Sequence, residues 1–260
     1  MHYLISDLSR ITGMSIEGIR KYEKEGIIAP QRSENGQYRI YDYLDITSMM
    51  RSRMYRALGF SLKETGELIN DASLEQARIQ LEQKKGEIAR EEELLLLKRK
   101  LLEEMIEELA ETENSLGKIS ICKMPAYYRI EFSKNGEIQR KAPALKLVRQ
   151  WMEYMPFVHV STRYSGKDTF GGVAIRDTYA SFFHIAESDQ VQYIPSGEAF
   201  RIYVCEGDNA VASYQYIEAL QRFASEHHFV VDECLGHSVT SLYKSSQYRR
   251  YRAIFARIHF

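Results

Sequence analysis

The sequence predicts a multi-domain chain: a small, mainly helical N-terminal domain, one long helix, and an α+β C-terminal domain. Three observations predict this organisation. Capped helical patterns fill residues 1–72, an apolar residue recurs at every seventh position of residues 73–117, and strand-like segments alternate with two amphipathic helices in residues 118–260. With 260 residues, the chain is long enough for separate domains that each bury a core.

The N-terminal domain is expected to hold four short helices and a hairpin. Each helical pattern starts at a polar residue suited to cap it, and these residues are Ser6, Ser15, Asp42 and Ser61. Glycines that tolerate left-handed backbone end three of the patterns, at Gly13, Gly26 and Gly59. The Asn35-Gly36 pair indicates a hairpin within residues 31–41. This order of elements is the outline of a winged helix-turn-helix.

The long helix carries the clearest periodicity. A capping box of Ser73 and Gln76 starts it, and the seven-residue repeat consists of Leu74, Leu81, Ile88, Leu95, Leu102, Leu109 and Leu116. A strict seven-residue repeat keeps one seam facing a partner helix, so residues 73–117 are expected to form a dimerising coiled coil. The companion seam is poorer, with Lys84, Glu91 and Lys98 at its positions. Packing of the helix on its own domain is therefore the alternative.

The C-terminal domain is expected to be duplicated, with a strand–helix–strand–strand unit that appears twice. Helices are predicted at 143–155 and 210–227, where apolar residues follow a helical period. Strands are predicted at 119–132, 157–164, 172–176, 199–205, 230–234, 239–243 and 252–258. Residue identity between the two units is weak, so the prediction of a pseudo-symmetric domain rests on the order of elements.

Composition narrows the class of protein. The net charge is −1 at pH 7, so any contact with nucleic acid needs a local patch of cations. The three cysteines, Cys122, Cys205 and Cys234, are scattered and odd in number, which favours a reducing compartment. Neither a secretory leader nor an apolar run of membrane-helix length is visible. We expect a cytoplasmic protein with no membrane partner.

The second helix and the hairpin carry the residues expected to contact DNA. In a helix-turn-helix, the second helix enters the major groove with its N-terminal residues near the bases. The candidate donors are Arg20, Lys21 and Tyr22 on this helix, Tyr38, Arg39 and Tyr41 on the hairpin, and Lys63 at the start of the fourth helix. Tyr22 and Tyr38 have an alternative role as core aromatics.

Three runs in residues 3–70, S-I-E-G-I-R-K-Y-E-K-E-G-I-I-A-P, N-G-Q-Y-R-I-Y and L-G-F-S-L-K-E, resemble the DNA-binding domain of the MerR family of transcription regulators. The resemblance implies a homodimer, joined by an antiparallel coiled coil, that binds palindromic promoter DNA and alters its geometry, and so acts on RNA polymerase indirectly. It assigns DNA contacts to Ser15, Arg20, Tyr22, Arg39 and Tyr41. Two departures, Lys21 in place of an aromatic residue and Gly18 within the helix, leave the operator sequence open.

Residues 119–260 resemble the GyrI-like effector-binding domain of multidrug-sensing regulators of the BmrR type, through I-P-S-G-E-A-F at 194–200 and Y-R-R-Y-R-A at 248–253. The resemblance implies a pocket for a small, often cationic and aromatic molecule. Its matching positions are Tyr164, Tyr251 and Trp151, the last equally expected in the core. The family's cation-pairing glutamate falls on Gly236, with Glu233 and His237 as neighbouring candidates. A neutral, zwitterionic or anionic effector is therefore open.

Other functions remain as alternatives. Some GyrI-like domains are hydrolases, but no nucleophile elbow, paired-carboxylate signature or phosphate-binding glycine loop is visible. A DNA-binding protein that has lost sensing is another. Metal sensing needs Cys or His near the ends of the long helix, yet residues 73–116 contain neither and Cys122 stands alone. We therefore expect no catalytic residue, no metal and no cofactor.

Overall fold

The computed structural model describes residues 2–259 except 34–35, 140–142, 207–212 and 245–246. The chain forms two compact units, 1–94 and 95–260. Helix α5 (Leu74–Ser115) runs through the boundary, so each unit contains part of it. No helix of the described residues combines the length and apolar character that crossing a bilayer requires.

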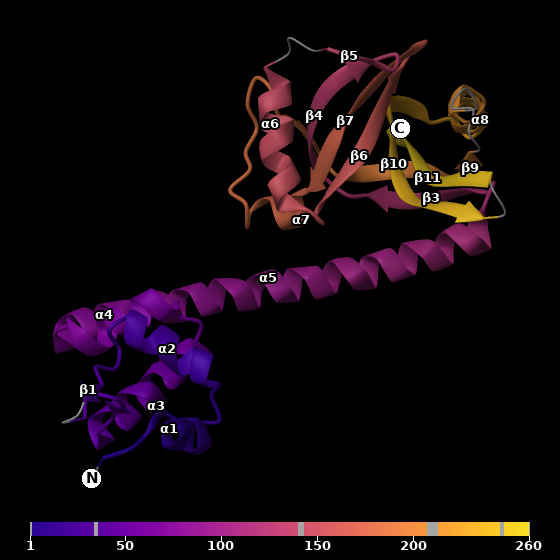
Figure 1. The fold of residues 1–260 in the computed structure, drawn as a ribbon. Coiled ribbons are helices and arrows are strands. Elements are labelled where there is room, and N and C mark those ends of the chain that lie inside the picture. Colours follow the sequence, from indigo (N-terminus) through magenta and orange to yellow (C-terminus); the bar gives the residue numbers. More distant parts are fainter. Residues whose placement is uncertain (1, 34–35, 140–142, 207–212, 245–246, 260) are drawn as a thin grey trace. The chain divides into compact units, whose positions relative to one another are not determined.

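The first unit contains the predicted helices and hairpin (Figure 1). Its elements are α1 (Ile5–Thr12), α2 (Ile16–Lys24), β1 (Gln31–Arg32), β2 (Arg39–Ile40), α3 (Tyr43–Ala57) and α4 (Leu62–Asn70). Leu8, Ile19, Tyr41 and Met49 are completely buried at the centre of their core. Gly36 has a left-handed φ of 71° in the hairpin connection, and its predicted turn partner Asn35 lies outside the described residues.

Three of the four predicted helix caps are confirmed. Ser15 Oγ accepts from Gly18 N at 3.1 Å, Asp42 Oδ1 from Asp45 N at 2.9 Å, and Ser61 Oγ from Glu64 N at 3.2 Å. The prediction for Ser6 is wrong, because α1 begins at Ile5 and its N-cap is Leu4. The backbone amide of Leu4 donates to Asp7 Oδ2 at 2.9 Å, so a carboxylate in the first turn satisfies this free amide.

In the second unit, the described residues form a nine-stranded antiparallel sheet in the order β3-β9-β11-β10-β6-β7-β4-β5, with β8 also paired to β4. The strands are β3 (Ile119–Met124), β4 (Tyr127–Lys134), β5 (Glu137–Ile138), β6 (Val158–Ser165), β7 (Asp168–Arg176), β8 (Gln192–Ile194), β9 (Gly197–Glu206), β10 (Val230–Lys244) and β11 (Gln247–His259). The helical segments are α6 (Ala144–Trp151), η1 (Met152–Tyr154), α7 (Asp177–Ala180) and α8 (Ser213–Glu226).

Two strand predictions need correction. The single strand expected at 119–132 is two strands, because Pro125 lacks the amide hydrogen that a continuing ladder requires. The strands expected at 230–234 and 239–243 are one strand, β10, in which register shifts at Val231/Glu233 and Ser238/Thr240 interrupt the apolar alternation. The first residues of the helix predicted at 210–227 lie outside the described residues.

The topology contains the predicted repetition. The segments β4-α6-β6-β7 and β9-α8-β10-β11 each place the last strand between the other two, giving the orders β4-β7-β6 and β9-β11-β10. These two strand units, both within the sheet of the second compact unit, meet where β6 pairs antiparallel with β10, from Cys234↔Tyr164 to His237↔Ser161. A backbone order can persist while sequences diverge, because strand pairing depends on main-chain hydrogen bonds.

The sheet of the second unit has two differently covered faces. Helix α8 packs Ile217, Leu220 and Ala224 against one face, in a cluster with Phe200 and Ile254. Side chains alternate along a strand, so the neighbouring residues of β9, β10 and β11 point to the opposite face. Residues 95–115 of α5 follow that opposite face, held by the ion pairs described below.

Candidate functional site

The exposed face of α2 holds the predicted DNA-reading cations. Ile19 and Tyr22 are buried in the core of the first unit, which fixes the orientation of the helix. Arg20 and Lys21 lie between them in sequence and are exposed. The hydroxyl of Ser15 accepts a hydrogen bond as the N-cap of α2 and so positions the N-terminus of this helix. The helix therefore presents two cations on a rigid support.

The hairpin arginine is held by a contact that the sequence prediction missed. Arg39 Nε lies 3.2 Å from Glu23 Oε2, and the hydroxyl of Tyr41 donates to Glu23 Oε1. The pKa of Tyr41 is raised, first by burial and then by this carboxylate. Glu23 thus links α2 to the hairpin, and the available signal was an acidic residue beside the cations in the second half of the helix.

The remaining DNA candidates differ in access. Tyr38 and Lys63 are exposed, and Lys63 lies 3.9 Å from Glu67 in an open ion pair. Tyr22 is a core residue, as its alternative interpretation proposed. Tyr41 needs correction: its side chain is 0% exposed, so in this conformation it supports Glu23 and does not reach a duplex.

Three glutamates of α5 contact the sheet in the second unit. Glu104 Oε2 accepts from Arg176 at 2.7 Å and from Tyr179 at 2.6 Å, and Glu111 Oε2 accepts from Arg201 at 2.7 Å and from Tyr203 at 2.8 Å. Between them, Glu108 Oε1 lies 2.7 Å from His237 Nε2. Spacings of four and three residues place all three carboxylates on one side of the helix.

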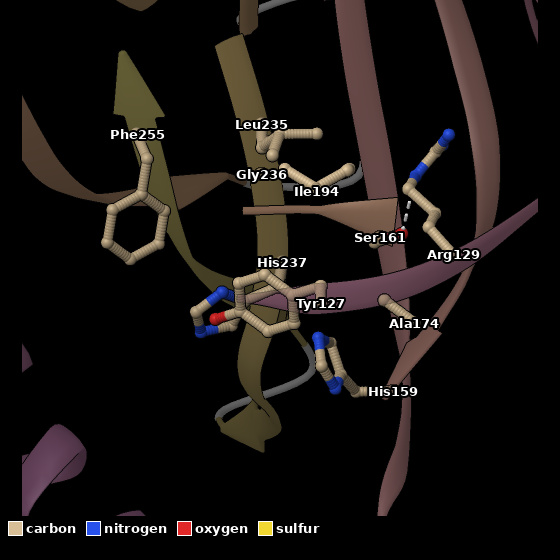
Figure 2. Close-up of a pocket in the computed structure, with 10 residues that line it drawn as sticks. All are labelled: Tyr127, Arg129, His159, Ser161, Ala174, Ile194, Leu235, Gly236, His237 and Phe255. Carbon is tan, nitrogen blue, oxygen red and sulfur yellow. Dashed lines mark hydrogen bonds between the residues drawn. The ribbon is translucent and has the colours of Figure 1, made fainter. Parts of the chain in front are cut away.

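Two cavities lie between this part of α5 and the sheet, and a third, lined by strand residues alone, adjoins them; we call the three together the α5 chamber. Two of them measure about 220 and 170 Å³ and share Glu104, Glu108 and Arg176. A third, smaller cavity shares His159 and His237 with the first and Tyr127 and Phe255 with the second (Figure 2). The smallest cavity is mainly apolar and aromatic, whereas charged residues of α5 and the sheet line much of the other two.

Edge-to-face ring contacts and buried polar groups line the chamber (Figure 2). The ring centroid of His159 lies 5.5 Å from that of Tyr127 and 5.4 Å from that of His237. Burial lowers the pKa of His159 well below its ordinary value, so this ring is neutral. Burial also raises the pKa of Tyr127 to about 12, and the nearby Arg176 opposes this shift.

The carboxylate of Glu108 is ionised in this chamber. Burial by itself raises its pKa, but the charge and hydrogen bond of His237, with Arg176 and Arg201 nearby, outweigh that effect and the pKa is lowered. The Glu108–His237 contact is therefore a charge-assisted link between α5 and β10.

The structure separates the predicted effector residues. His237 lines the α5 chamber, but Tyr164 lies in the α8 cluster on the opposite face of the sheet. Trp151 is buried and lines none of the chamber's cavities. Tyr251 is not a lining residue of the chamber either. The prediction that these four residues and Glu233 share one pocket is therefore wrong. Strand alternation places only Tyr164 on the face opposite His237. Trp151 lies on α6, and neither Tyr251 nor Glu233 lines a cavity of the chamber.

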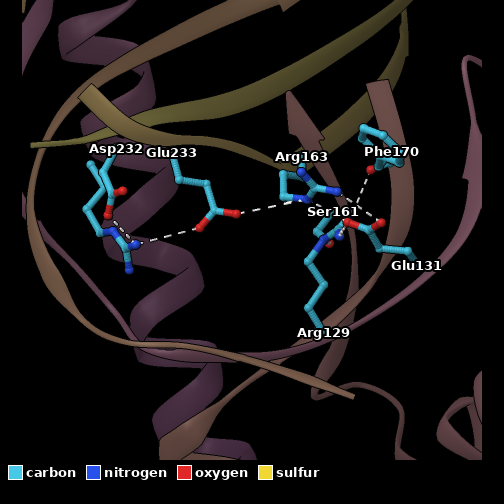
Figure 3. Close-up of polar contacts among 8 residues, drawn as sticks. Arg129, Glu131, Ser161, Arg163, Phe170, Asp232 and Glu233 are labelled. Carbon is cyan, nitrogen blue, oxygen red and sulfur yellow. Dashed lines mark hydrogen bonds and ion pairs between the residues drawn. The ribbon is translucent and has the colours of Figure 1, made fainter. Parts of the chain in front are cut away.

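Glu233 belongs to a chain of ion pairs that crosses the seam between the two strand units (Figure 3). It lies 3.9 Å from both Arg163 and Arg257, and Arg163 Nε lies 2.6 Å from Glu131. Glu131 in turn pairs with Arg129. Burial raises the pKa of Glu233. Its role here is structural, and the expectation of a ligand contact is corrected.

The chamber residues missed by sequence reasoning are Tyr127, His159 and Glu108. Each is a residue type common on strands or helices, so its sequence context indicates no binding role. The three come together only through the pairing of the strands and the packing of α5 on the sheet. One signal was available for Glu108, since Glu104, Glu108 and Glu111 form an i, i+4, i+7 row on a face of the helix away from the heptad seam. Among the described residues, no three His, Cys, Asp or Glu side chains are grouped to hold a metal ion.

Comparisons with known proteins identify the N-terminal region. The family model described as "MerR HTH family regulatory protein" matches residues 3–72. The HTH-type transcriptional regulator CueR of Escherichia coli O157:H7 is 45% identical over 67 residues, which cover 25% of this chain and 49% of CueR. The chain thus spans about half the length of that relative.

A longer match comes from CueR of Vibrio cholerae (strain ATCC 39315), which is 35% identical over 106 residues, covering 38% of this chain and 76% of the relative. A solved structure of an EcmrR–DNA complex aligns over 99% of both chains at 14% identity, with a TM-score of 0.38 that supports no conclusion about fold. The two CueR relatives are both named HTH-type transcriptional regulators. The chain belongs to the MerR family of helix-turn-helix regulatory proteins.

Proposed function

We propose that this protein is a homodimeric transcription regulator that binds promoter DNA through α2 and the hairpin and senses a small molecule in the α5 chamber. The observation that carries the proposal is that α5 has two separate stripes. One stripe, with Glu104 and Glu108, docks on the sheet, while the heptad seam on another face stays exposed.

The heptad seam supports dimerisation. All of its members, from Leu74 to Leu116, are exposed in the single chain, at 40% or more. A continuous apolar seam of this length is costly to leave in water and is satisfied by a partner helix with the same repeat. A second copy of the chain supplies such a helix, so two α2 helices can engage two half-sites of a palindromic operator.

Sequence-independent affinity for DNA comes from cations that can reach phosphates. Arg20 and Lys21 are exposed on α2, Arg39 is half-exposed on the hairpin, and Lys63 is exposed at the start of α4. The names of the CueR relatives, which are transcriptional regulators, agree with such a role.

The α5 chamber supports effector sensing by a GyrI-like domain. A molecule that occupies it contacts His159, His237 and Tyr127 on the sheet and competes for the carboxylate of Glu108 on α5. Such a molecule changes the balance between docked and undocked positions of α5, and α5 continues into the first unit. The proposed output is altered promoter geometry, through which RNA polymerase responds.

The test uses the full-length protein with duplexes selected from a random pool. We expect two protomers per duplex and binding that weakens as salt rises. Arg20→Ala is expected to weaken binding, whereas Arg99→Ala, which removes an exposed arginine from α5, serves as the matched control. A protomer that sediments alone and retains no duplex in dilute buffer would end the proposal.

The sensing part is tested separately with a panel of aromatic small molecules. A ligand that binds the native chain raises its melting temperature. Glu108→Gln is expected to change that shift and to uncouple it from operator binding. Ligands that stabilise the protein but never change operator binding contradict sensing and leave DNA binding intact.

A further inference from the structure

The opposite face of the sheet contains a second cavity, which the proposed function does not use. It measures about 530 Å³, a volume typical of small-molecule sites. Its polar lining comes from both strand units, and includes Thr162, Tyr164, Lys167, Tyr214, Arg250 and Arg252. Tyr164 also packs in the α8 cluster, which places this cavity on the α8 face, away from the α5 chamber.

Cations predominate in this lining. Lys167, Arg250 and Arg252 line the cavity, whereas none of its described lining residues carries a carboxylate. Glu206, which is buried beside it, lies 3.7 Å from Arg250 and 3.6 Å from Arg252. Lys167 adds a further positive charge at the exposed rim, and the nearby carboxylate of Asp168 is paired with Lys134 and accepts from the lining residue Asn135. The cavity therefore favours a negatively charged occupant.

Several hydrogen-bond donors in this lining lack an acceptor. The hydroxyls of Tyr164 and Tyr214 and the Nε–H of Arg250 are buried and have no hydrogen-bond partner among the described residues. Buried donors without partners are uncommon in native proteins, because each costs its lost hydration. A ligand rich in acceptor atoms would satisfy them.

Backbone geometry keeps the arginine side chain in place. A Cβ on Gly236 would lie 3.0 Å from Arg252 Nη2 and 3.3 Å from the Tyr164 ring and hydroxyl. Glycine at this position lets the guanidinium lie close to β10, and Arg252 Nη2 also donates to Thr162 Oγ1 of the neighbouring strand β6 at 2.9 Å. Since the cation occupies this space, an acidic side chain at position 236 would have to displace it.

We propose that this cavity is a binding site for a small organic anion, either a carboxylate or a phosphate monoester, separate from the α5 chamber. Guanidinium groups and phenol hydroxyls donate to both kinds of anion, so the donor set by itself does not distinguish them. The proposal does not depend on the α5 chamber being an effector site.

The experiment measures dissociation constants by calorimetry with the full-length protein and probes that share an aryl skeleton. The probes are 4-hydroxyphenylacetate, phenyl phosphate, neutral 4-hydroxyphenylacetamide and cationic tyramine. At least one anion is expected to bind ten times more tightly than the amide and the amine, and the tighter anion identifies the preferred class. Equal or tighter binding of the amide or the amine overturns the proposal, and so does an absence of binding by all four probes.

Variants locate the site. Tyr164→Phe and Tyr214→Phe each remove an unpaired hydroxyl, so folding is expected to be retained while anion affinity falls on the order of tenfold. Lys167→Gln at the exposed rim is expected to weaken the anions and leave the amide unchanged. The matched control is Tyr127→Phe, which removes a buried phenol hydroxyl from the α5 chamber.

The control separates the two proposals. If Tyr127→Phe weakens anion binding and Tyr164→Phe does not, the anion occupies the α5 chamber; the second site is then refuted and sensing at the α5 chamber survives. If the Tyr164 and Tyr214 variants weaken the anion while operator binding responds to no ligand, the second site stands without the sensing proposal.

Discussion

The arginines proposed to contact DNA in the first unit and those of the ion-pair chain in the second unit differ in their exposure to solvent. In the first unit, Arg20 is exposed on α2 and Arg39 is half-exposed on the hairpin. In the second unit, the side chain of Arg129 is 1% exposed, and those of Arg163 and Arg257 are mostly buried in the ion-pair chain of Figure 3. The same residue type therefore serves a surface that can contact a polyanion in one unit and an internal support in the other.

The difference follows from solvation. An exposed guanidinium keeps most of its hydration, so its attraction to a phosphate is available at little cost to folding. A buried guanidinium must have its charge compensated within the fold, and removal of one partner leaves an uncompensated buried group. Net charge, which is −1 for the whole chain, does not reveal this division.

The largest effect is expected for Arg129→Ala. Loss of this side chain removes the hydrogen bond from Arg129 Nε to Ser161 Oγ at 2.9 Å and the pairing with Glu131. The free energy of unfolding is expected to fall by about 3–5 kcal/mol. Chemical denaturation measures it, with the exposed Arg149→Ala expected to stay within about 0.5 kcal/mol. Equal effects of the two variants would contradict the comparison.

Next in size is Leu102→Lys in the exposed seam of α5. A charge at a seam position opposes helix pairing, so the dimer is expected to dissociate at micromolar concentration and operator affinity to fall by about a hundredfold. Sedimentation velocity and fluorescence anisotropy measure the two quantities. Leu96→Lys is the control, because Leu96 is also exposed but lies off the seven-residue repeat.

Glu108→Gln tests the link between α5 and the sheet through pH. The folded-state pKa of Glu108 is lowered, so its contribution to stability is present above its ordinary pKa and is lost as pH falls through the folded value. At pH 7 we expect the variant to lose about 1–3 kcal/mol, with the difference from wild type shrinking below about pH 4.5. A difference that stays constant from pH 7 to pH 3 would exclude an ionised Glu108.

The smallest effect is expected for Arg39→Ala at the hairpin. This variant removes one phosphate donor and leaves Glu23 without its 3.2 Å partner on the DNA-facing side. Binding is expected to weaken similarly for all DNA sequences, with the salt dependence falling by about one charge. An unchanged salt slope removes the hairpin from the contact surface, whereas loss of specificity alone would indicate a base contact.

Sequence reasoning succeeded best where the signal is local. The caps at Ser15, Asp42 and Ser61 and the long helix from Ser73 depend on residues three or four positions apart. It failed where partners are distant in sequence. Glu233 was a candidate because it lies near Gly236, but it pairs with Arg163 and Arg257. Tyr251 was a candidate because it matches an aromatic position of the GyrI-like domain, but it lines none of the chamber's cavities.

What the sequence by itself determined is the family, the helical order of the first unit, the exposed heptad seam and the duplicated order of strands and helices, because these follow from short-range periodicity and capping. Only the tertiary structure decided which charges are buried, that Glu104, Glu108 and Glu111 face the sheet, and that two cavities lie on opposite faces. Packing of α5 on the sheet joins residues 129 positions apart in the Glu108–His237 contact, and no local pattern specifies such a pair.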